Sequence, residues 1–421
     1  MSLYIQKFGG TSVSTLKKIK TIVNNISNFL KNGHKIVLVI SAMSGDTNRL
    51  IRFSKKLNKK PTPREIDMLV STGEQITISL ITIALNTLDI EAISYTGPQL
   101  GILTSNNYTC ARINNINLNM LHNDLNENKV IVVAGFQGIN ILGNITTLGR
   151  GGSDTTAVAL SAALQAKECQ IYTDVEGIYT TDPRVCTKAK YILFLTVEEM
   201  LELSSLGSKV LQIRSIEYAG KYNVKLRVLS SFNKNYGTLI IPDYLFLSNL
   251  YMENPMISGI AFNINESKIT VCNIQDIPGM AYKIIKPISN ANINIDMIIQ
   301  NISNINNITD FTFTIEKNDF IKSYKILKKK VVNNIGGLLN IDEKITKISL
   351  VGVGMKSQSG VASHMFNILG NEGINIRMIS TSEIKISILI DDKYLEKAIC
   401  SLHTAFGLNI KQIIQQNNIN N

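Results

Sequence analysis

Lys7-Phe8-Gly9-Gly10-Thr11-Ser12 is the stretch that decides the fold of this chain. It follows an apolar run, Leu3 to Ile5, and it precedes apolar residues at helical spacing from Leu16 to Leu30. This order predicts a strand, a tight glycine turn, and a helix capped by Thr11 or Ser12.

Such a turn is suited to binding a phosphate. Two glycines let the backbone approach a bulky anion, and the first N–H groups of the helix point at it with the favourable end of the helix dipole. Lys7 adds a cation at the end of the strand. The motif alone leaves open an ordinary strand-to-helix turn with a solvated lysine.

Length and composition indicate a globular protein of several domains. The chain has 421 residues, of which 44% are hydrophobic, so we expect two to four domains. No run approaches the roughly 20 apolar residues of a membrane span. The nearest, Ile76 to Leu88, is interrupted by Thr and Ser and is expected to be a buried helix. The chain begins directly with a strand and no leader, so we expect a cytoplasmic protein without a membrane partner.

Cysteine, histidine and charge patterns suggest neither a metal site nor nucleic-acid binding. The five cysteines are far apart and form no C-x-x-C pair, and the four scattered histidines are expected at the surface. The formal net charge is +11. Because Lys, Asn and Ile are all abundant and have A/T-rich codons, a biased genome explains this charge, and no basic stripe with interleaved aromatics appears.

The first half of the chain alternates strands and helices. Strands are predicted at 35–40, 90–95, 130–136 and 169–174, which favours a three-layer α/β domain with a mostly parallel sheet. The first of these ends in a polar loop, Ser41 to Thr47, at the edge where ligands of such sheets bind. Ser71 to Gln75 interrupts a helical region, and Glu74 there is either part of a kink or a site carboxylate.

A second glycine-rich turn, Leu148 to Thr156, leads into a strong helix-forming run and carries Arg150. Arginine grips a carboxylate or phosphate at two points. Further on, Thr173-Asp174 ends a strand and is followed by a loop to Arg184. This loop either holds a nucleotide or is a long turn around Asp182-Pro183.

The end of the first domain is predicted from helix and strand signals. A capping box, Thr196 to Glu199, opens a helix to Leu206; a second helix is expected from Ser208 to Tyr222, and a strand from Lys225 to Ser230. The domain should end near residue 245.

These motifs together resemble the aspartate kinase family of the amino-acid kinase fold. Five stretches match in the family's order: 7–13, 41–47, 72–74, 149–154 and 173–184. The resemblance implies ATP, with Mg²⁺, and L-aspartate as substrates, and 4-phospho-L-aspartate and ADP as products. A carboxylate needs no general base at neutral pH, so the chemistry requires positioned cations and N–H groups.

The resemblance also implies roles for individual residues. Lys7 and Asp154 are the expected catalytic pair, in which Asp154 orients Lys7 or the nucleotide's metal. The ATP-binding residues are expected to be Lys7, Phe8, Gly9, Gly10, Thr173, Asp174, Tyr179, Arg184, Lys209 and Val210. The substrate-binding residues are expected to be Ser41, Thr47, Glu74, Arg150 and Ser153, with Glu74 on the ammonium and Arg150 on a carboxylate.

The second half contains an internal repeat. Residues 279–298 match residues 360–379 without a gap, and each copy has a strand before it and a strand after it. This is most of a ferredoxin-like βαββαβ unit, and the pair resembles tandem ACT domains. We therefore expect a kinase domain at 1–245, a linker at 246–260, a first ACT domain at 261–335 and a second at 336–415.

ACT domains imply feedback inhibition by an amino acid, lysine and/or threonine. The expected effector-binding residues are Asp276, Gly279, Asn294, Ile295 and Gln300, across an interface with Asn375, Ile376, Thr381 and Ser382. A dimerisation surface without regulation is the alternative. By the same resemblance, the assembly is a homodimer or a heterotetramer with a short ACT-only subunit started at Met252.

Two rival functions fit parts of the sequence. One is another enzyme of the same fold, such as a glutamate, acetylglutamate or uridylate kinase. The other is a non-catalytic amino-acid sensor, which is disfavoured because Lys7, Glu74, Arg150 and Asp174 are all present.

Overall fold

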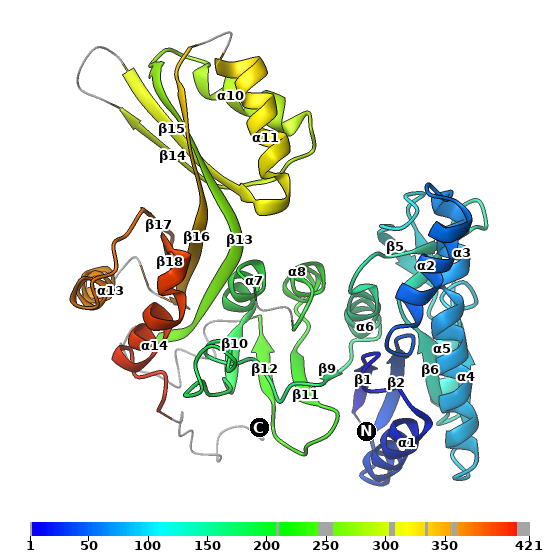
Figure 1. Cartoon of the computed structure of the whole chain (residues 1–421). Coiled ribbons are helices and arrows are strands. Elements are labelled where there is room, and N and C mark those ends of the chain that lie inside the picture. The colour runs from blue at the N-terminus through cyan, green and yellow to red at the C-terminus, as the bar shows by residue number, and fades with distance from the viewer. Residues whose placement is uncertain are drawn as a thin grey trace. The chain divides into compact units, whose positions relative to one another are not determined.

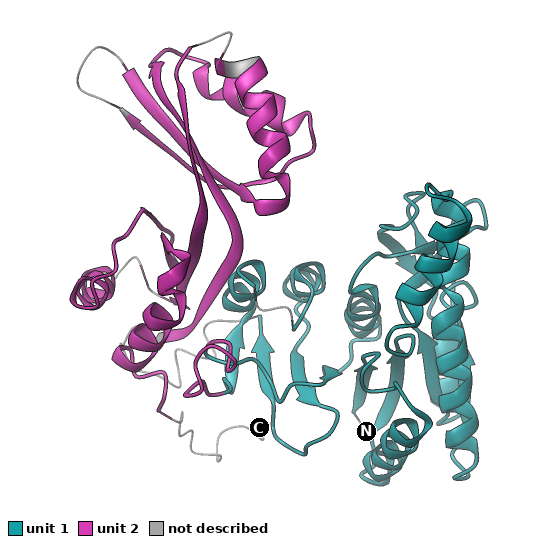
Figure 2. Cartoon of the chain, in the orientation of Figure 1, with its two compact units in different colours: residues 1–180, 191–254, 412–421 teal, residues 181–190, 255–411 magenta. Residues whose placement is uncertain are grey.

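The structure is a computed structural model of the whole chain, and it describes residues 2–207, 210–242, 256–302, 308–332, 336–353, 355 and 360–410. The chain forms two compact units (Figure 2). The first takes the described residues up to Thr180 and from Tyr191 to 242, and the second takes Thr181–Lys190 and the described residues from 256 to 410. The expected linker at 246–260 falls mostly outside the described residues, as does Met252, so the domain boundaries stay predictions.

An eight-stranded sheet forms the centre of the first unit (Figure 1). Its order is β10-β12-β11-β9-β1-β2-β6-β3, and all neighbours are parallel except β11 and β12. Its apolar strands are buried on both faces, as a parallel sheet requires. The strands are β1 (Leu3–Phe8), β2 (Lys35–Ile40), β3 (Ala92–Tyr95), β6 (Val130–Ala134), β9 (Glu168–Thr173), β10 (Phe194–Thr196), β11 (Leu226–Ser230) and β12 (Thr238–Ile241).

Helices cover both faces of this sheet, which confirms the predicted three-layer fold. On one face, α1 (Leu16–Lys31) and α4 (Thr72–Asn86) pack their apolar residues on β2 and β6 in one core. On the other face, α6 (Gly152–Ala163) packs on β1 and β9. The predicted cap of α1 was wrong, because the helix begins only at Leu16 and Thr15 caps it by accepting a hydrogen bond from the Lys18 amide.

A smaller four-stranded sheet was not predicted. Its strands, in the order β5-β4-β7-β8, are β5 (Ile113–Ile116), β4 (Ile102–Thr104), β7 (Gln137–Asn140) and β8 (Ile145–Thr147). The remaining helices of this part are α2 (Asp46–Leu57), α3 (Pro63–Val70) and α5 (Asn119–Asn126). Strands of three or four residues give too short a pattern to read from sequence.

One helical stretch, Pro63–Asn86, has the length and composition of a membrane span. Half of its most apolar window is buried inside the protein. Ile78, Ile81 and Leu85 from this stretch belong to the core around β2 and β6, so it is a core helix, as its sequence suggested.

Two helices close the first unit. The capping box on α7 (Val197–Ser205) is present as predicted, with Thr196 accepting from the Glu199 amide and Glu199 accepting from the Thr196 amide. The following helix, α8 (Ile213–Lys221), begins later than the predicted Ser208. Gln212 takes the cap position there, in extended backbone conformation.

The second unit is built on one six-stranded antiparallel sheet with the order β14-β15-β13-β16-β18-β17. Its strands are β13 (Met256–Gln275), β14 (Ile295–Ile302), β15 (Ile308–Glu316), β16 (Leu338–Val353), β17 (Met378–Thr381) and β18 (Lys385–Asp391). Its α-helices are α10 (Met280–Ser289), α11 (Phe320–Leu327), α13 (Gly360–Asn371) and α14 (Leu395–Ala405). Short 3-10 helices lie at Lys317–Asp319 and Asp392–Tyr394, and a short π-helix lies at Lys328–Val332. This arrangement confirms the predicted pair of ferredoxin-like repeats.

The two repeats share the long strands β13 and β16. The early part of β13 contributes Ile257 and Ile260 to the core of the second repeat, whereas Ile269 and Val271 further along belong to the core of the first. The segment 181–190 also enters the core of the second repeat, where Cys186 is buried and Val185 packs beside it. His403 is buried as well, so the expectation that all four histidines lie at the surface was wrong.

Candidate active site

Lys7 and Asp154 form the central ion pair of the candidate site. Lys7 lies near the end of β1, and Asp154 lies in the first turn of α6. Their Nζ and Oδ1 atoms are 2.5 Å apart, and the side chains are only 12% and 8% exposed. Because Arg150 precedes α6 by two residues, the lysine and the second glycine turn meet at one corner of the first unit.

The first glycine turn is packed tightly against the loop after β2. A Cβ on Gly10 would lie 2.7 Å from the Ala42 carbonyl oxygen, so only glycine fits without a shift. The Gly9 amide donates to the Tyr172 carbonyl at 3.2 Å. The turn is thereby held between β2 and β9 at the carboxyl ends of the strands, where ligands of open α/β sheets bind.

Glu74 presents a buried acceptor beside this turn. It lies in the first turn of α4, is 3% exposed, and its Oε1 accepts a hydrogen bond from the Ala42 amide at 3.1 Å. Its Oε2 is buried and has no hydrogen-bond partner among the described residues. Burial raises the pKa of Glu74 to about 7. Such a carboxylate is suited to receive a cationic group.

Arg150 is exposed, and within the described part of the chain no hydrogen bond or ion pair engages its guanidinium. Ser153, close by on α6, is buried against Gly135 at the end of β6. Ser41, directly after β2, and Thr47, in the first turn of α2, are both half-buried. The expected substrate-binding residues thus lie directly after β2, just before α6, or in the first turns of α2, α4 and α6.

The residues expected on the nucleotide side are only partly assembled. Thr173, at the end of β9, donates its hydroxyl to Asp174 at 3.1 Å, and Tyr179 pairs with Tyr191 in an isolated bridge. Arg184 belongs to the second unit and forms an ion pair with Asp182. Val210 is half-buried, and Lys209 lies outside the described residues.

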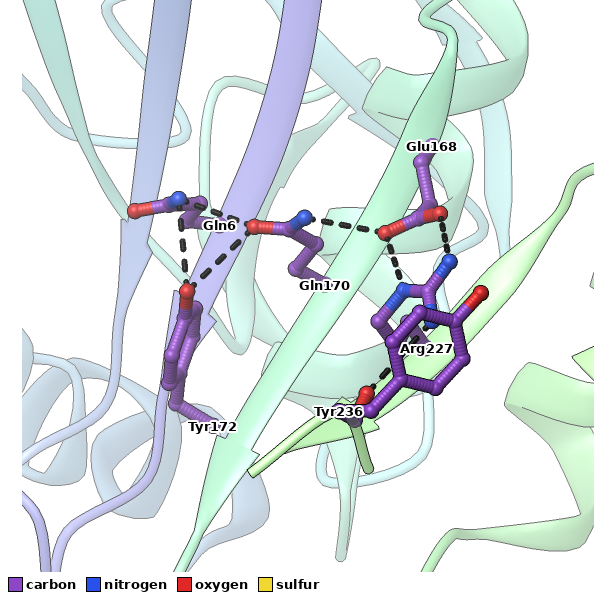
Figure 3. A network of polar contacts seen from close by, with 6 residues as sticks. All are labelled: Gln6, Glu168, Gln170, Tyr172, Arg227 and Tyr236. Atoms are coloured by element: carbon purple, nitrogen blue, oxygen red, sulfur yellow. Dashed lines mark hydrogen bonds and ion pairs between the residues drawn. The ribbon is translucent and has the colours of Figure 1, made fainter. Parts of the chain in front are cut away.

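A polar network joins side chains of β1, β9 and β11 (Figure 3). Because neighbouring residues of a strand point to opposite faces of the sheet, Gln6 and this network lie on the face opposite Lys7. Gln6 donates to Gln170, Gln170 donates to Glu168, and Arg227 grips Glu168 with two bonds of 2.8 Å (Figure 3). At the site end of β9, the Tyr172 ring stacks on Phe8 with centroids 4.6 Å apart. Phe8 therefore acts from the core, beneath the glycine turn.

Sequence reasoning missed several residues around the site. Ser231 shares a hydrogen bond of 2.6 Å with Ser12, and it follows β11 too far along the chain to be linked to the first turn by pattern. Asp67 on α3 is fully buried and accepts three hydrogen bonds. The signal for Asp67 was its helical spacing with the buried Val70 and Glu74.

The expected effector residues form two separate groups in this chain. Near the start of α10, Gln300 donates to Asp276 at 3.3 Å, and Gly279 caps the helix with φ of 85°. Ile295 and Gln300 lie on β14 and Asn294 directly precedes it, while Asp276 and Gly279 lie between β13 and α10. The others, Asn375, Ile376, Thr381 and Ser382, lie around β17. Because β14 and β17 are opposite edges of one sheet, the two groups cannot meet within a single chain.

Matches to known protein families and solved structures define the class of protein to which this chain belongs. Residues 2–230 match the amino acid kinase family, and residues 269–331 and 348–406 match the ACT domain. The solved structure of E. coli aspartokinase III in complex with aspartate and ADP has the same fold, with a TM-score of 0.76 at 24% identity, covering 96% of this chain and 99% of that one. The first unit therefore has the fold of an amino acid kinase.

Relatives over nearly the full length define the family further. An aspartokinase of Pseudomonas aeruginosa is 55% identical over 97% of this chain and 98% of its own length. An aspartokinase of Helicobacter pylori is 45% identical over 97% of this chain and 100% of its own length. The chain belongs to the aspartokinase family.

Proposed function

We propose that this chain is an aspartate kinase, which transfers the γ-phosphoryl group of ATP to the β-carboxylate of L-aspartate. The products are 4-phospho-L-aspartate and ADP, and the reaction is the first step of lysine, threonine and methionine biosynthesis. The observation that carries the proposal is the Lys7–Asp154 ion pair, which joins the strand before the first glycine turn to the helix that follows the second.

The reaction requires two anions to meet. An oxygen of the β-carboxylate attacks the γ-phosphorus, the bond from phosphorus to the β,γ-bridging oxygen breaks, and ADP leaves with the electron pair. No proton has to be removed from a carboxylate at neutral pH. Catalysis therefore rests on positioning and on charge stabilisation, and Lys7 supplies a cation whose direction Asp154 fixes.

Substrate recognition divides between two charged groups. The buried and unpaired Oε2 of Glu74 accepts the ammonium of aspartate, and the exposed guanidinium of Arg150 grips its α-carboxylate in two-point fashion. Ser41, Thr47 and Ser153 position the substrate between them.

ATP binds with its phosphates on Gly9 and Gly10, where the missing side chains let the phosphates approach the backbone closely, and Phe8 supports that turn from below. Thr173, Asp174, Tyr179, Arg184, Lys209 and Val210 form the nucleotide side. Mg²⁺ arrives as part of the MgATP substrate, and the carboxylates of Asp154 and Asp174 are the groups that would face it.

The test is an ADP-release assay with L-aspartate, L-glutamate and UMP as alternative acceptors. We expect turnover with L-aspartate and little with the other two. Turnover confined to L-glutamate or UMP would assign another enzyme of the same fold, and no turnover with any acceptor would favour an amino-acid sensor.

Regulation is proposed to act through the ACT repeats. The two effector groups belong to opposite sheet edges, so a complete site requires the β14 edge of one chain beside the β17 edge of another. This favours a homodimer, or a heterotetramer with a short ACT-only subunit. Titrating activity with lysine and threonine, singly and together, tests the proposal, and activity insensitive to both would refute it.

The proposed location of this enzyme is the cytoplasm, where both ATP and aspartate are available. Fractionation of the native host, followed by immunodetection, tests this location. The same blot reports whether a short subunit starting at Met252 exists, because that product would appear as a second and smaller band.

A further inference from the structure

Asp67 is a buried carboxylate that, within the described residues, accepts hydrogen bonds from backbone amides and a hydroxyl of segments distant in sequence. Its side chain is 0% exposed. Oδ2 accepts from the amides of Thr109 and Thr147, both at 2.9 Å, and Oδ1 accepts from the Thr147 hydroxyl at 2.6 Å. Burial raises the pKa of Asp67, and these three hydrogen bonds oppose the shift. A buried carboxylate is costly unless it is well bonded, so this arrangement fixes Thr147 firmly to α3.

Arg214 holds the same two segments from the opposite side. It lies on α8, and its guanidinium donates to the carbonyls of Leu148 at 2.9 Å and Ala111 at 2.8 Å. The Ala111 amide in turn donates to the Thr147 carbonyl at 2.9 Å. The segments 109–111 and 147–148 are therefore clamped between a buried carboxylate and a partly buried guanidinium.

The clamped segment leads directly into the turn that carries Arg150. Gly149 and Gly151, on either side of Arg150, have φ of 80° and 71°. A Cβ on Gly151 would lie 1.7 Å from the Gln212 side chain, and one on Gly149 would lie 3.0 Å from the Thr109 carbonyl. The backbone on both sides of Arg150 is thus packed, while its side chain extends freely.

Asp67 also belongs to the helical stretch that positions Glu74. α3 ends at Val70, and α4 begins at Thr72 with Glu74 in its first turn. At the joint, the Ser71 carbonyl accepts from the buried Gln137 side chain at 3.0 Å. Asp67 therefore ties the turn of Arg150 to the same short helical segment that holds Glu74.

We propose that Asp67 is a positioning residue that sets the spacing between Glu74 and Arg150, with Arg214 bracing the turn from the other side. This inference rests on the proposed function, in which these two groups bind the ammonium and the α-carboxylate of the amino acid. Fixing them leaves a defined length for the side chain that must reach the γ-phosphoryl group. Glutamate is one methylene longer than aspartate, so the clamp is a determinant of selectivity between them.

The experiment compares Asp67→Ala, Asp67→Asn and the wild-type enzyme. In Asp67→Ala, loss of the three hydrogen bonds should raise KM for L-aspartate about tenfold or more and lower the ratio of kcat/KM for aspartate over glutamate by a similar factor, with KM for ATP within about twofold. Asn keeps an oxygen for the two amides and an NH2 group for the Thr147 hydroxyl. Asp67→Asn should therefore restore KM for aspartate to within about threefold of wild type.

A double-variant cycle separates positioning from general destabilisation. If Asp67 acts through Arg150, Asp67→Ala should change KM for aspartate by less than about twofold in an Arg150→Ala background. Asp124→Ala is the matched control, since Asp124 is another buried carboxylate of the same unit and accepts from the Tyr95 hydroxyl. It should leave KM for aspartate unchanged.

The outcomes distinguish the two proposals. If the wild-type enzyme does not phosphorylate L-aspartate, the proposed function fails. If it does, two results would refute the positioning role alone. Asp67→Ala could leave KM for aspartate and the selectivity ratio unchanged, or it could change KM for ATP and kcat by the same factor as KM for aspartate. Should Asp67→Ala not fold, Thr147→Val removes the 2.6 Å contact alone, and an unchanged KM for aspartate in that folded variant refutes the positioning role as well.

Discussion

Replacing Glu74 with Gln tests how the active site uses a buried carboxylate. The side chain is 3% exposed, and burial raises its pKa from 4.5 to about 7. The ionised form is then about 3 kcal/mol less favourable in the folded chain than in the unfolded one. Gln keeps an oxygen for the Ala42 amide and cannot ionise, so it isolates the effect of charge.

The direction in which stability changes with pH follows from the pH at which the folded and the unfolded chain each lose the Glu74 proton. Above pH 4.5 the unfolded chain has released the Glu74 proton, whereas the folded chain keeps it until about pH 7. The unfolded state therefore binds fewer protons over this interval, and the folded state loses stability as the pH rises. Relative to Glu74→Gln, the wild-type free energy of unfolding should fall by about 2.5 kcal/mol between pH 5 and pH 8.

Substrate binding should show the opposite dependence on pH. An ammonium group prefers the ionised carboxylate, so kcat/KM for aspartate should fall as the pH drops below about 7, by up to about tenfold per pH unit. Glu74→Gln should raise KM for aspartate about 10- to 100-fold, because a hydrogen bond between two charged groups is lost, and its profile should be flat in this range.

Two measurements suffice, namely urea unfolding of the ligand-free protein and ADP release at saturating MgATP, each at pH 5 to 8 for both proteins. A constant gap between the two unfolding free energies would mean that Glu74 is already ionised at pH 5. An inflection near pH 7 that persists in Glu74→Gln would assign the pH dependence to a different group.

Three further predictions concern the glycine turns and a helix end. Lys7→Ala should lower kcat at least about 100-fold and lower the free energy of unfolding by about 3 to 5 kcal/mol, because it leaves Asp154 unpaired. The double variant with Asp154→Asn should regain the wild-type urea midpoint but not kcat. If turnover also recovered in the double variant, Lys7 would have no role in the mechanism. Gly10→Ala places a methyl group 2.7 Å from the Ala42 carbonyl, so kcat/KM for ATP should fall at least about tenfold, and wild-type kinetics would contradict the proposed close packing. Thr196→Ala removes the capping box of α7 and should cost about 1 kcal/mol in urea unfolding without changing kcat, whereas an unaltered midpoint would mean that the cap contributes nothing.

Much of the sheet and the two glycine turns could be predicted because their signals are local. A run of Val, Ile and Leu such as Lys35–Ile40, followed by small polar residues, predicts a buried strand and the loop at its end. The position of Lys7 follows from its place in β1. Its ion pair with Asp154, by contrast, depends on how α6 crosses β1, and only the family resemblance pointed to that pair.

The clamp around Arg150 could not be predicted because its contacts are distant in sequence. Asp67 binds groups 42 and 80 positions away, and Arg214 binds carbonyls 66 and 103 positions away. No periodic pattern links such residues. The predicted capping residue of α1 was wrong for a different reason. Thr11, Ser12 and Thr15 are all suitable capping residues, and sequence alone does not choose among them.

A long turn around Asp182-Pro183 was one of the two interpretations of the loop that leads to Arg184, yet the segment 181–190 supplies part of a hydrophobic core. Cys186 is 2% exposed there, and the Cys400 thiol lies 3.7 Å from the Val185 carbonyl oxygen. A separately translated polypeptide beginning at Met252 would lack this segment. The hydrophobic core of its second repeat would then lack Val185 and Cys186, and the apolar residues that these two cover would be exposed. Its solubility would depend on burying those residues against segment 181–190 of a full-length chain or against another protein surface.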